Sequence, residues 1–372
     1  MLGHQSLTSH HFADGGDEVI LRMSNHRRTV NRRAIAAIGV LVGGALAAGA
    51  AGILPGVALA HPPSAHKASV PKAGAQRATF APYVDASLSP PFDLPSESKA
   101  SRVKEYTLGF VNRGSGCVPQ WSGTSSLDNP VAAKIGALRK AGGDVRVSFG
   151  GAAGAELATV CSNPTKLAAA YAKVVDRYKL TKLDFDIEGF ALHMPDVTTR
   201  RSQALAKLQK DHPGLDITFT LPVLPNGLTP DGVKLLADAK GNGVRVSGVN
   251  IMAMDYGPSF KGDMGDLAIK AATATQGQLK STLRLSDAAA WKALVVTPMI
   301  GVNDVQGETF TLQDARQLVT FAKSKHLRGL SMWSTTRDKQ CPGGTKDQAD
   351  PTCSGIVQKP LAFTKVFASY RG

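Results

Sequence analysis

Three acidic side chains occupy every second position of one short apolar segment, residues 183–188, which reads LDFDIE. They are Asp184, Asp186 and Glu188, and the residues between them are Leu, Phe and Ile. Alternate side chains of an extended strand point to one face, so the three carboxyl groups share a face. Like charges at this spacing cannot all ionise, and we expect the pKa of the outermost acid, Glu188, to be raised. Such a group is a general acid, although solvated acids at a strand end or a Mg²⁺ or Ca²⁺ site are alternatives.

The elements that must hold these acids follow from the alternation of short β-rich runs with segments of helical period from residue 79 onward. The expected strands are 80–85, 106–111, 145–150, 183–188, 217–222, 246–255, 294–300 and 329–333, and the last expected helix is 360–370. Apolar strands separated by amphipathic helices indicate a parallel sheet covered by helices. Eight repeats predict a single (β/α)8 TIM barrel over residues 79–372. A doubly wound open sheet, the alternative, would normally carry a Gly-rich phosphate loop after its first strand, which FAPYVDASL lacks.

The first 78 residues read as export and linker segments. Residues 34–60 form a Gly- and Ala-rich apolar stretch that follows four arginines and ends in Ala-Leu-Ala, which predicts a secretory signal peptide. A transmembrane anchor is the alternative. Because the preceding residues carry acidic side chains, Met23 is the expected start of the chain, within an N-terminal extension and signal peptide over 1–60. Residues 61–78 lack apolar periodicity and predict a disordered linker, so the mature protein is expected to be extracellular.

Composition excludes several classes of protein. A hydrophobic fraction of 43% excludes disorder along the whole chain, and a single long apolar stretch excludes a polytopic membrane protein. The net charge of +14 permits a nucleic-acid partner, but the basic residues are scattered and accompany no nucleic-acid motif. We therefore expect a solvated basic surface and no nucleic-acid partner.

Export places the four cysteines in an oxidising compartment, where they allow three disulfide pairings. We expect Cys117–Cys161 and Cys341–Cys353, because each pair would tie loops on one end of the barrel. A zinc site is the alternative, and no CxxC spacing or paired histidine accompanies the cysteines. No metal and no cofactor are expected.

Four segments resemble the motifs of glycoside hydrolase family 18, the chitinases and their relatives. LDFDIEG resembles the DxxDxDxE signature, and VSFGG (147–151) resembles the SxGG motif that ends the third strand of the family. VNIMAMDYG (249–257) resembles the Met-x-Tyr-Asp motif, and LSMWS (330–334) resembles the segment with the eighth-strand tryptophan. The segments occur in the family's order, and the resemblance covers residues 79–372. Within the family, the sequence is most similar to a bacterial and archaeal branch with the motifs DFDIE and MAMDYG.

Two positions depart from the family pattern. The first Asp of DxxDxDxE falls on Thr181, and the sixth-strand tyrosine is replaced by Met254, with Asp255 kept and Tyr256 following. The family tyrosine helps bind the acetamido group of the substrate. Strand alternation would point Tyr256 to the same side as Met252 and Met254. The partner of the acetamido group therefore stays open.

The resemblance implies an extracellular, monomeric chitinase that hydrolyses β-1,4 bonds between N-acetylglucosamine units, with retention and with the substrate's acetamido group as nucleophile. Glu188 would protonate the glycosidic oxygen and later activate water. Asp186 would orient the acetamide, and Asp184 would share a proton with Asp186. A lectin-like barrel that binds chitin without cleaving it, and an endo-β-N-acetylglucosaminidase acting on N-glycans, are the alternatives.

The same resemblance assigns further contacts in the cleft. Trp333 would form the floor under the sugar at subsite −1, and Asp255 and Asp304 are candidates to bind sugar hydroxyls, with Met254 and Tyr256 nearby. The connection over residues 302–311 is too short for the small α+β insertion that deepens the cleft of many processive chitinases. We therefore expect a shallow cleft and internal, non-processive cleavage.

Overall fold

The computed structural model describes residues 79–152 and 155–371. The predicted N-terminal extension and signal peptide (1–60), the start at Met23 and the linker (61–78) lie outside the described residues. The described residues belong to one compact unit, Ser69–Gly372. Among the helices of the described residues, none combines the length and the apolar character needed to cross a bilayer.

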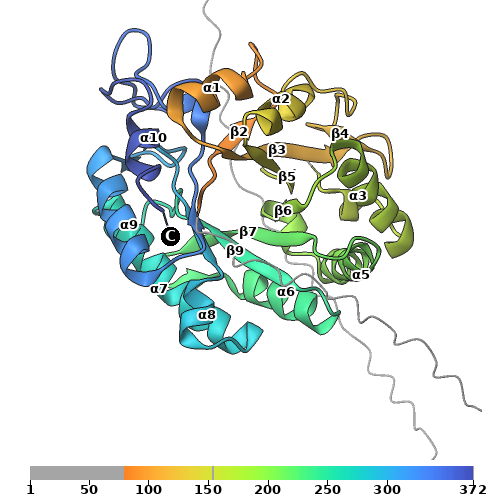
Figure 1. Ribbon diagram of the computed structural model, residues 1–372. Coiled ribbons are helices and arrows are strands. Elements are labelled where there is room, and N and C mark those ends of the chain that lie inside the picture. The colour runs from red at the N-terminus through yellow and green to blue at the C-terminus, as the bar shows by residue number, and fades with distance from the viewer. Residues whose placement is uncertain (1–78, 153–154, 372) are drawn as a thin grey trace, which may run out of the picture. The chain divides into compact units, whose positions relative to one another are not determined.

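Parallel strands form the centre of this unit (Figure 1). In chain order they are β1 (Thr79–Phe80), β2 (Tyr83–Asp85), β3 (Glu105–Arg113), β5 (Asp144–Gly150), β6 (Lys182–Asp186), β7 (Asp216–Leu224), β9 (Val246–Met252), β10 (Leu294–Thr297) and β13 (Gly329–Leu330). Short antiparallel partners extend β3 and β7, and a separate hairpin follows β10. They are β4 (Pro119–Trp121), β8 (Gly227–Leu228), and β11 (Gly301–Val302) with β12 (Thr309–Phe310).

The sheet closes through its first segment, which supplies both β1 and β2. β1 pairs with β13, and β2 pairs with β3, both in parallel register. Between them, Ala81 N–H donates to the carbonyl of Leu330, and Thr107 N–H donates to the carbonyl of Pro82. The segment is thus one barrel strand with neighbours on both sides, which gives eight strands in a ring. The predicted (β/α)8 barrel is confirmed.

Helices follow each barrel strand and surround the sheet (Figure 1). They are α1 (Leu94–Ser101), α2 (Ile135–Lys140), α3 (Pro164–Tyr178), α5 (Pro195–Asp211), α6 (Pro230–Gly241), α7 (Met264–Leu283), α9 (Leu312–Lys325) and α10 (Ala362–Phe367). Two shorter helices, α4 (Gly189–Leu192) and α8 (Asp287–Trp291), and three 3-10 turns, η1 (Ala132–Lys134), η2 (Leu157–Thr159) and η3 (Thr335–Arg337), lie in the connections. Several helices start at a side-chain cap followed by proline, as at Asn163 and Thr229.

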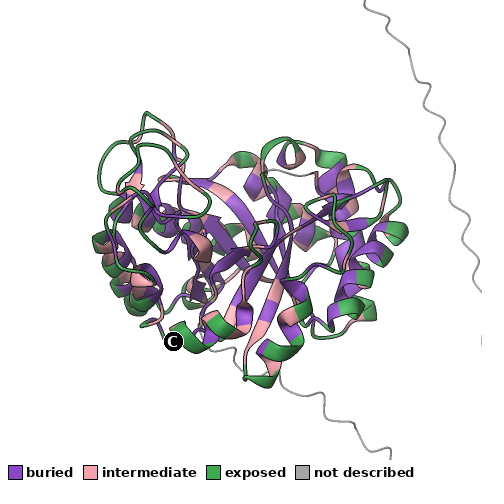
Figure 2. Cartoon of the chain, turned by 90° about the horizontal axis from the view of Figure 1, so that it is seen from above, coloured by how far each residue is buried: buried purple, intermediate pink, exposed green. Residues whose placement is uncertain are grey.

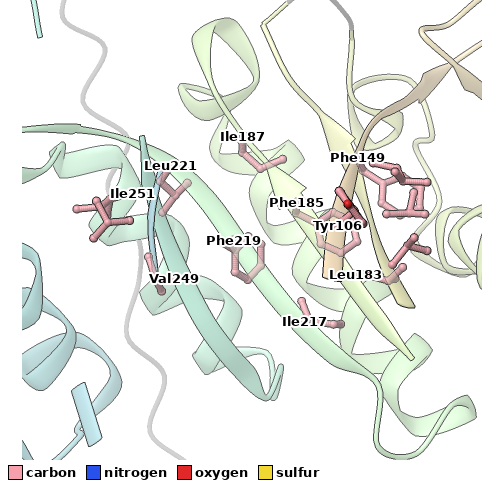
Figure 3. Packing of buried hydrophobic residues seen from close by; sticks show 14 of the residues in the cluster. Tyr106, Phe149, Leu183, Phe185, Ile187, Ile217, Phe219, Leu221, Val249 and Ile251 are labelled. Carbon is pink, nitrogen blue, oxygen red and sulfur yellow. The ribbon is translucent and has the colours of Figure 1, made fainter. Parts of the chain in front are cut away.

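Strand alternation divides the side chains between the helices and the barrel interior. On the outer face Phe149 stacks on Phe185 with ring centroids 5.1 Å apart, and Phe185 lies 6.0 Å from Phe219 (Figure 3). The strands are buried at the centre, and the exposed surface lies on the outer sides of helices and in loops (Figure 2). The inner face is polar where the predicted acids lie, so Asp184 and Asp186 point into the barrel, as the alternation predicts.

Several strands end earlier than the sequence pattern suggests. β6 ends at Asp186, so Glu188 lies past the sheet with an extended backbone (φ −140°, ψ 175°) and precedes α4. β9 ends at Met252 and β10 at Thr297. The apolar runs continue past these ends because the connecting residues are themselves buried, and apolar content alone does not separate a strand from a buried loop.

Both predicted disulfides are present. Cys117, between β3 and β4, is bonded to Cys161, which precedes α3. Cys341 is bonded to Cys353 in the long connection between η3 and α10. Each disulfide therefore ties connections that follow barrel strands. These connections lie at the carboxyl end of the barrel, where the site opens.

Candidate active site

A cavity of about 180 Å³ opens at the carboxyl ends of the barrel strands. Its lining combines carboxyl, hydroxyl, aromatic and methionine side chains: Tyr83, Phe110, Ala152, Asp186, Glu188, Thr220, Met252, Met254, Asp255, Thr297, Met299, Asp304 and Trp333. The structure thus brings six of the eight residues predicted for catalysis and substrate binding to one cavity. The other two, Asp184 and Tyr256, are not part of its lining.

Asp184 lies deeper in the barrel and is surrounded by hydroxyl groups. Tyr83 and Ser148 donate to its Oδ2 at 3.0 and 2.7 Å, and Thr218 donates to its Oδ1 at 2.6 Å. The hydroxyl of Thr220 lies 2.9 Å from both oxygens. Four hydroxyls from three strands therefore compensate one buried carboxylate, which is 1% exposed. This arrangement fixes the middle of the barrel beneath the cavity.

Asp186 is buried at the floor of the cavity and is hydrogen-bonded to Glu188. Its Oδ1 is buried and has no hydrogen-bond partner. Burial, together with the charges of Glu188 and Asp184, raises the pKa of Asp186 well above its usual value. The sharing of a proton between Asp186 and Asp184 stays a prediction: the oxygens of Asp184 accept hydrogen bonds from hydroxyls, and its charge acts on Asp186.

Glu188 is partly buried at the rim of the cavity. Desolvation raises the pKa of Glu188 to about 7; the hydrogen bond from Asp186 lowers it in part, and the charge of Asp255 raises it further. The expected increase in the pKa of Glu188 is therefore present, and burial is its largest cause. A carboxyl group with a pKa near neutrality both donates and accepts a proton at physiological pH.

Backbone contacts hold the acids in place, and they explain the two glycines of the VSFGG segment. Gly150 has φ +103°, and a Cβ there would lie 2.0 Å from the carbonyl oxygen of Asp186. Gly151 N–H donates to the same carbonyl at 3.0 Å. On the other side, Ile187 N–H donates to the carbonyl of Thr220 at 3.0 Å. The chain that carries Asp186 and Glu188 is thus bonded to both neighbouring strands up to the cavity.

Aromatic side chains form one side of the cavity. The indole of Trp333 stacks on Phe110 with centroids 5.6 Å apart and meets Tyr83 edge-on at 5.8 Å. Trp333 is half-buried, so part of its surface is left toward the cavity. A flat apolar surface beside carboxyl groups suits a pyranose ring, which has an apolar face and a polar edge.

The segment after β9 places its residues differently from strand alternation. Asp255 has φ +50°, which turns the chain, so that Met254 lines the cavity while Tyr256 turns into the core against Phe260. The hydroxyl of Tyr256 is buried without a hydrogen-bond partner, and burial raises its pKa. The expectation that Tyr256 points with Met252 and Met254 is wrong, because β9 has already ended at Met252.

The two remaining acids lie on one rim of the cavity. Asp255 accepts a hydrogen bond from Val305 N–H at 3.0 Å, and burial raises its pKa. Asp304, in the hairpin connection after β10, is exposed. His193 lies outside the cavity lining, and its Nδ1 is 2.7 Å from a carboxylate oxygen of Asp231.

Sequence reasoning missed several polar and aromatic residues of the site. The sequence patterns give no role to Tyr83, Phe110, Ser148, Thr218 or Thr220. A usable signal exists for the two threonines, because they occupy alternate positions of the strand that follows the acidic one. Tyr83 and Phe110 lie in apolar runs and carry no comparable signal.

The chemistry available in this cavity is proton transfer beside a buried carboxyl group. Glu188 holds a proton near neutral pH at the rim, and Asp186 presents an unpartnered oxygen a short distance below it. In residues 79–152 and 155–371, three or more His, Cys, Asp or Glu side chains are nowhere grouped so that they could hold a metal ion.

Comparison with known proteins gives close relatives. No protein-family model matches the chain. A probable bifunctional chitinase/lysozyme of Escherichia coli K12 is 38% identical over 323 residues, which are 82% of this chain and 36% of that protein. Endochitinase 11 of Metarhizium anisopliae is 38% identical over 285 residues, 73% of this chain and 55% of that protein. The chain thus spans about one third and about half the length of these two relatives.

The fold has a similar counterpart among solved structures. The crystal structure of the catalytic domain of a hyperthermophilic chitinase from Pyrococcus furiosus is 36% identical and superposes with a TM-score of 0.72. The match covers 79% of this chain and 94% of that domain. Catalytic-site mutants of the same domain have been solved in complex with chito-oligosaccharides.

Proposed function

The chain belongs to glycoside hydrolase family 18, the chitinases and their relatives, and on this premise we propose that it is an extracellular chitinase. Its substrate is a chain of β-1,4-linked N-acetylglucosamine, which it cleaves internally with retention of configuration. The observation that carries the proposal is that Glu188, with a pKa of about 7, lines the same cavity as Asp186, whose Oδ1 is buried and unpartnered, beside an aromatic wall of Trp333, Phe110 and Tyr83.

The reaction starts with proton transfer from Glu188 to the glycosidic oxygen. The acetamido carbonyl oxygen of the sugar at subsite −1 attacks C1 as the bond to the leaving sugar breaks, which gives an oxazolinium ion. The carboxylate of Glu188 then takes a proton from water, and the oxygen of that water opens the oxazolinium ring. The nucleophile comes from the substrate, so the enzyme needs only one acid at the glycosidic bond.

Asp186 orients the acetamido group in this proposal. Its buried Oδ1 accepts the acetamide N–H, and once the proton of the pair lies on Glu188 the negative charge of Asp186 stabilises the positive charge that develops on the oxazolinium ring. The hydrogen bond between Asp186 and Glu188 lets the pair hold one proton before substrate binds. Asp184 is a positioning residue, since its hydroxyl partners come from the neighbouring strands β5 and β7 and from β2 across the barrel.

Two parts of the cavity lining contact the substrate: the aromatic wall with Trp333 and Phe110, and an acidic rim formed by Asp255 and Asp304. Trp333, backed by Phe110, supports the apolar face of the sugar at subsite −1. Met254, Asp255 and Asp304 also line the cavity, where Asp255 and Asp304 accept hydrogen bonds from sugar hydroxyls. Tyr256 has no place in this scheme because its ring lies in the core.

Two features support the finer assignments. Both disulfides suit a protein that folds in an oxidising compartment, which agrees with the signal peptide expected over residues 34–60. The connection between β10 and α9 is the short hairpin of β11 and β12, which agrees with internal and non-processive cleavage.

Hydrolysis of N-acetylglucosamine tetramer to hexamer by the wild type and by Glu188→Gln, with product anomers followed by NMR, tests the proposal. We expect the β-anomer first and near-complete loss of activity in the variant. A high-mannose glycopeptide assayed in parallel separates chitinase from endo-β-N-acetylglucosaminidase. Binding of the oligomers without any hydrolysis by the wild type would instead identify a lectin.

A further inference from the structure

Phe190 lies two residues after Glu188, in α4, with 76% of its surface exposed. Single exposed apolar residues are common on proteins and need no function. Phe190 differs in its place, because the helix that carries it begins directly after the proposed proton donor at the rim of the cavity.

The short helix holds this ring in a defined position. Leu192 is 5% exposed and anchors α4 in the core, and the carbonyl of Phe190 accepts a hydrogen bond from His193 N–H at 3.1 Å. The ring of His193 in turn contacts Asp231 at the start of α6 through a 2.7 Å hydrogen bond. The exposed ring is therefore carried by a segment that is fixed at both its buried and its exposed side.

The ring of strands gives the direction in which Phe190 lies relative to the aromatic wall. β6, which leads to Glu188 and Phe190, and β13, which leads to Trp333, are separated by four steps in both directions around the eight-stranded barrel. The two elements therefore lie on opposite sides of the barrel, and both Glu188 and Trp333 line the cavity at its mouth. A glycan that rests on Trp333 and presents a glycosidic oxygen to Glu188 continues past Glu188 on the side of α4.

We infer that Phe190 is a stacking platform for an N-acetylglucosamine unit on the leaving-group side of the bond that is cleaved. This inference rests on the proposed function and adds a binding site to it. The exposed ring covers the apolar face of a pyranose, and removal of both surfaces from water supplies binding energy. Phe190 therefore contributes to cleavage of substrates with sugars beyond the cleaved bond and contributes nothing to a substrate without them.

Two substrates separate these cases. The hexamer of N-acetylglucosamine carries sugars on both sides of the bond, whereas the leaving group of chitobiosyl fluoride is a single atom. For Phe190→Ala we expect kcat/KM for the hexamer to fall by about tenfold, with the value for the fluoride within about twofold of the wild type. Phe190→Trp should restore the hexamer value. Val357→Ala removes an equally exposed apolar side chain, 72% exposed, from the connection after β13 and should change neither.

Each outcome decides between the proposals. An equal loss on both substrates, or no loss on the hexamer, overturns the platform while the wild-type activity still supports the proposed function. An unchanged loss in Phe190→Trp also overturns it, because any large aromatic surface serves for stacking. Failure of the wild type to hydrolyse either substrate overturns the proposed function and the platform together.

Discussion

The carboxyl groups of Asp186 and Glu188 are joined by a hydrogen bond at the floor and rim of the cavity. Asp184, two residues before Asp186, is instead saturated by hydroxyl donors. The three acids of residues 184–188 therefore divide into a fixed inner carboxylate and an outer pair joined by a hydrogen bond. Because the outer pair faces the cavity, its proton is available to a bound substrate.

Glu188→Gln removes the ionisable group of the proposed proton donor without changing its size. We expect kcat to fall by at least about 10²-fold, the usual contribution of general acid catalysis. The variant should also be more stable at neutral pH. The pKa of about 7 in the folded protein lies above the ordinary value of 4.5, so the protonated acid stabilises the wild-type fold at low pH, and this stabilisation is lost as pH rises through 7.

Thermal unfolding measured at pH 4 and pH 8 tests this consequence. The increase in Tm of Glu188→Gln over the wild type should be larger at pH 8 than at pH 4. Equal increases at the two pH values would show that Glu188 is ionised as readily in the fold as in water.

Asp255→Asn tests the electrostatic part of the Glu188 pKa. The charge of Asp255 raises the pKa of Glu188, so its removal should lower that pKa. Activity that requires protonated Glu188 falls as pH rises through its pKa, and this fall should move to lower pH by less than about one unit. Asp304→Asn is the matched control, because exposed Asp304 lines the same rim but its charge acts on Asp255, whereas the charge of Asp255 acts on Glu188. The pH profile of kcat/KM is the measurement, and an equal shift in both variants would contradict the assignment.

The sequence indicated the barrel and the acidic strand because both depend on local periodicity. The alternation of acid and apolar residues over 183–188 fixes which side chains face inward, since a one-residue change of register would put Phe185 into the polar interior. The first segment pairs with both β3 and β13 because an eight-stranded barrel closes on itself. Eight predicted β/α units are therefore enough to predict this pairing.

The details that sequence reasoning missed depend on contacts between distant segments. Tyr83 and Asp184 are 101 residues apart, and no local pattern marks the tyrosine as the partner of the acid. The position of Tyr256 depends on the left-handed conformation of Asp255, which is uncommon for a residue other than glycine. That turn is supported by the hydrogen bond from Val305, 50 residues later.

Tyr83→Phe tests the role of the hydroxyl cage of Asp184, the hydroxyl groups of Tyr83, Ser148, Thr218 and Thr220 that bond to its carboxylate. The variant removes one donor to a fully buried carboxylate and should lower the free energy of unfolding by about 1–3 kcal/mol. It should also lower kcat on chitin oligomers, because Tyr83 lines the cavity as well. Tyr256→Phe is the matched control: its buried hydroxyl has no partner, so its loss should leave stability and activity unchanged or raise stability slightly. Urea denaturation and oligomer kinetics measure the two effects, and equal losses in both variants would argue against the cage.

Replacement of each disulfide by two serines should affect the fold and the site differently. In the chain-entropy description, closing the 12-residue separation of Cys341–Cys353 stabilises the fold by about 3 kcal/mol, and the 44-residue separation of Cys117–Cys161 by about 4 kcal/mol. The Cys117–Cys161 disulfide also holds the connection between β5 and α3, which contributes Ala152 to the cavity. We therefore expect both double variants to unfold at lower urea concentration, and the Cys117/Cys161 variant alone to show a raised KM at a temperature where it is still folded. A raised KM in the Cys341/Cys353 variant instead would place the substrate contact on the connection between η3 and α10.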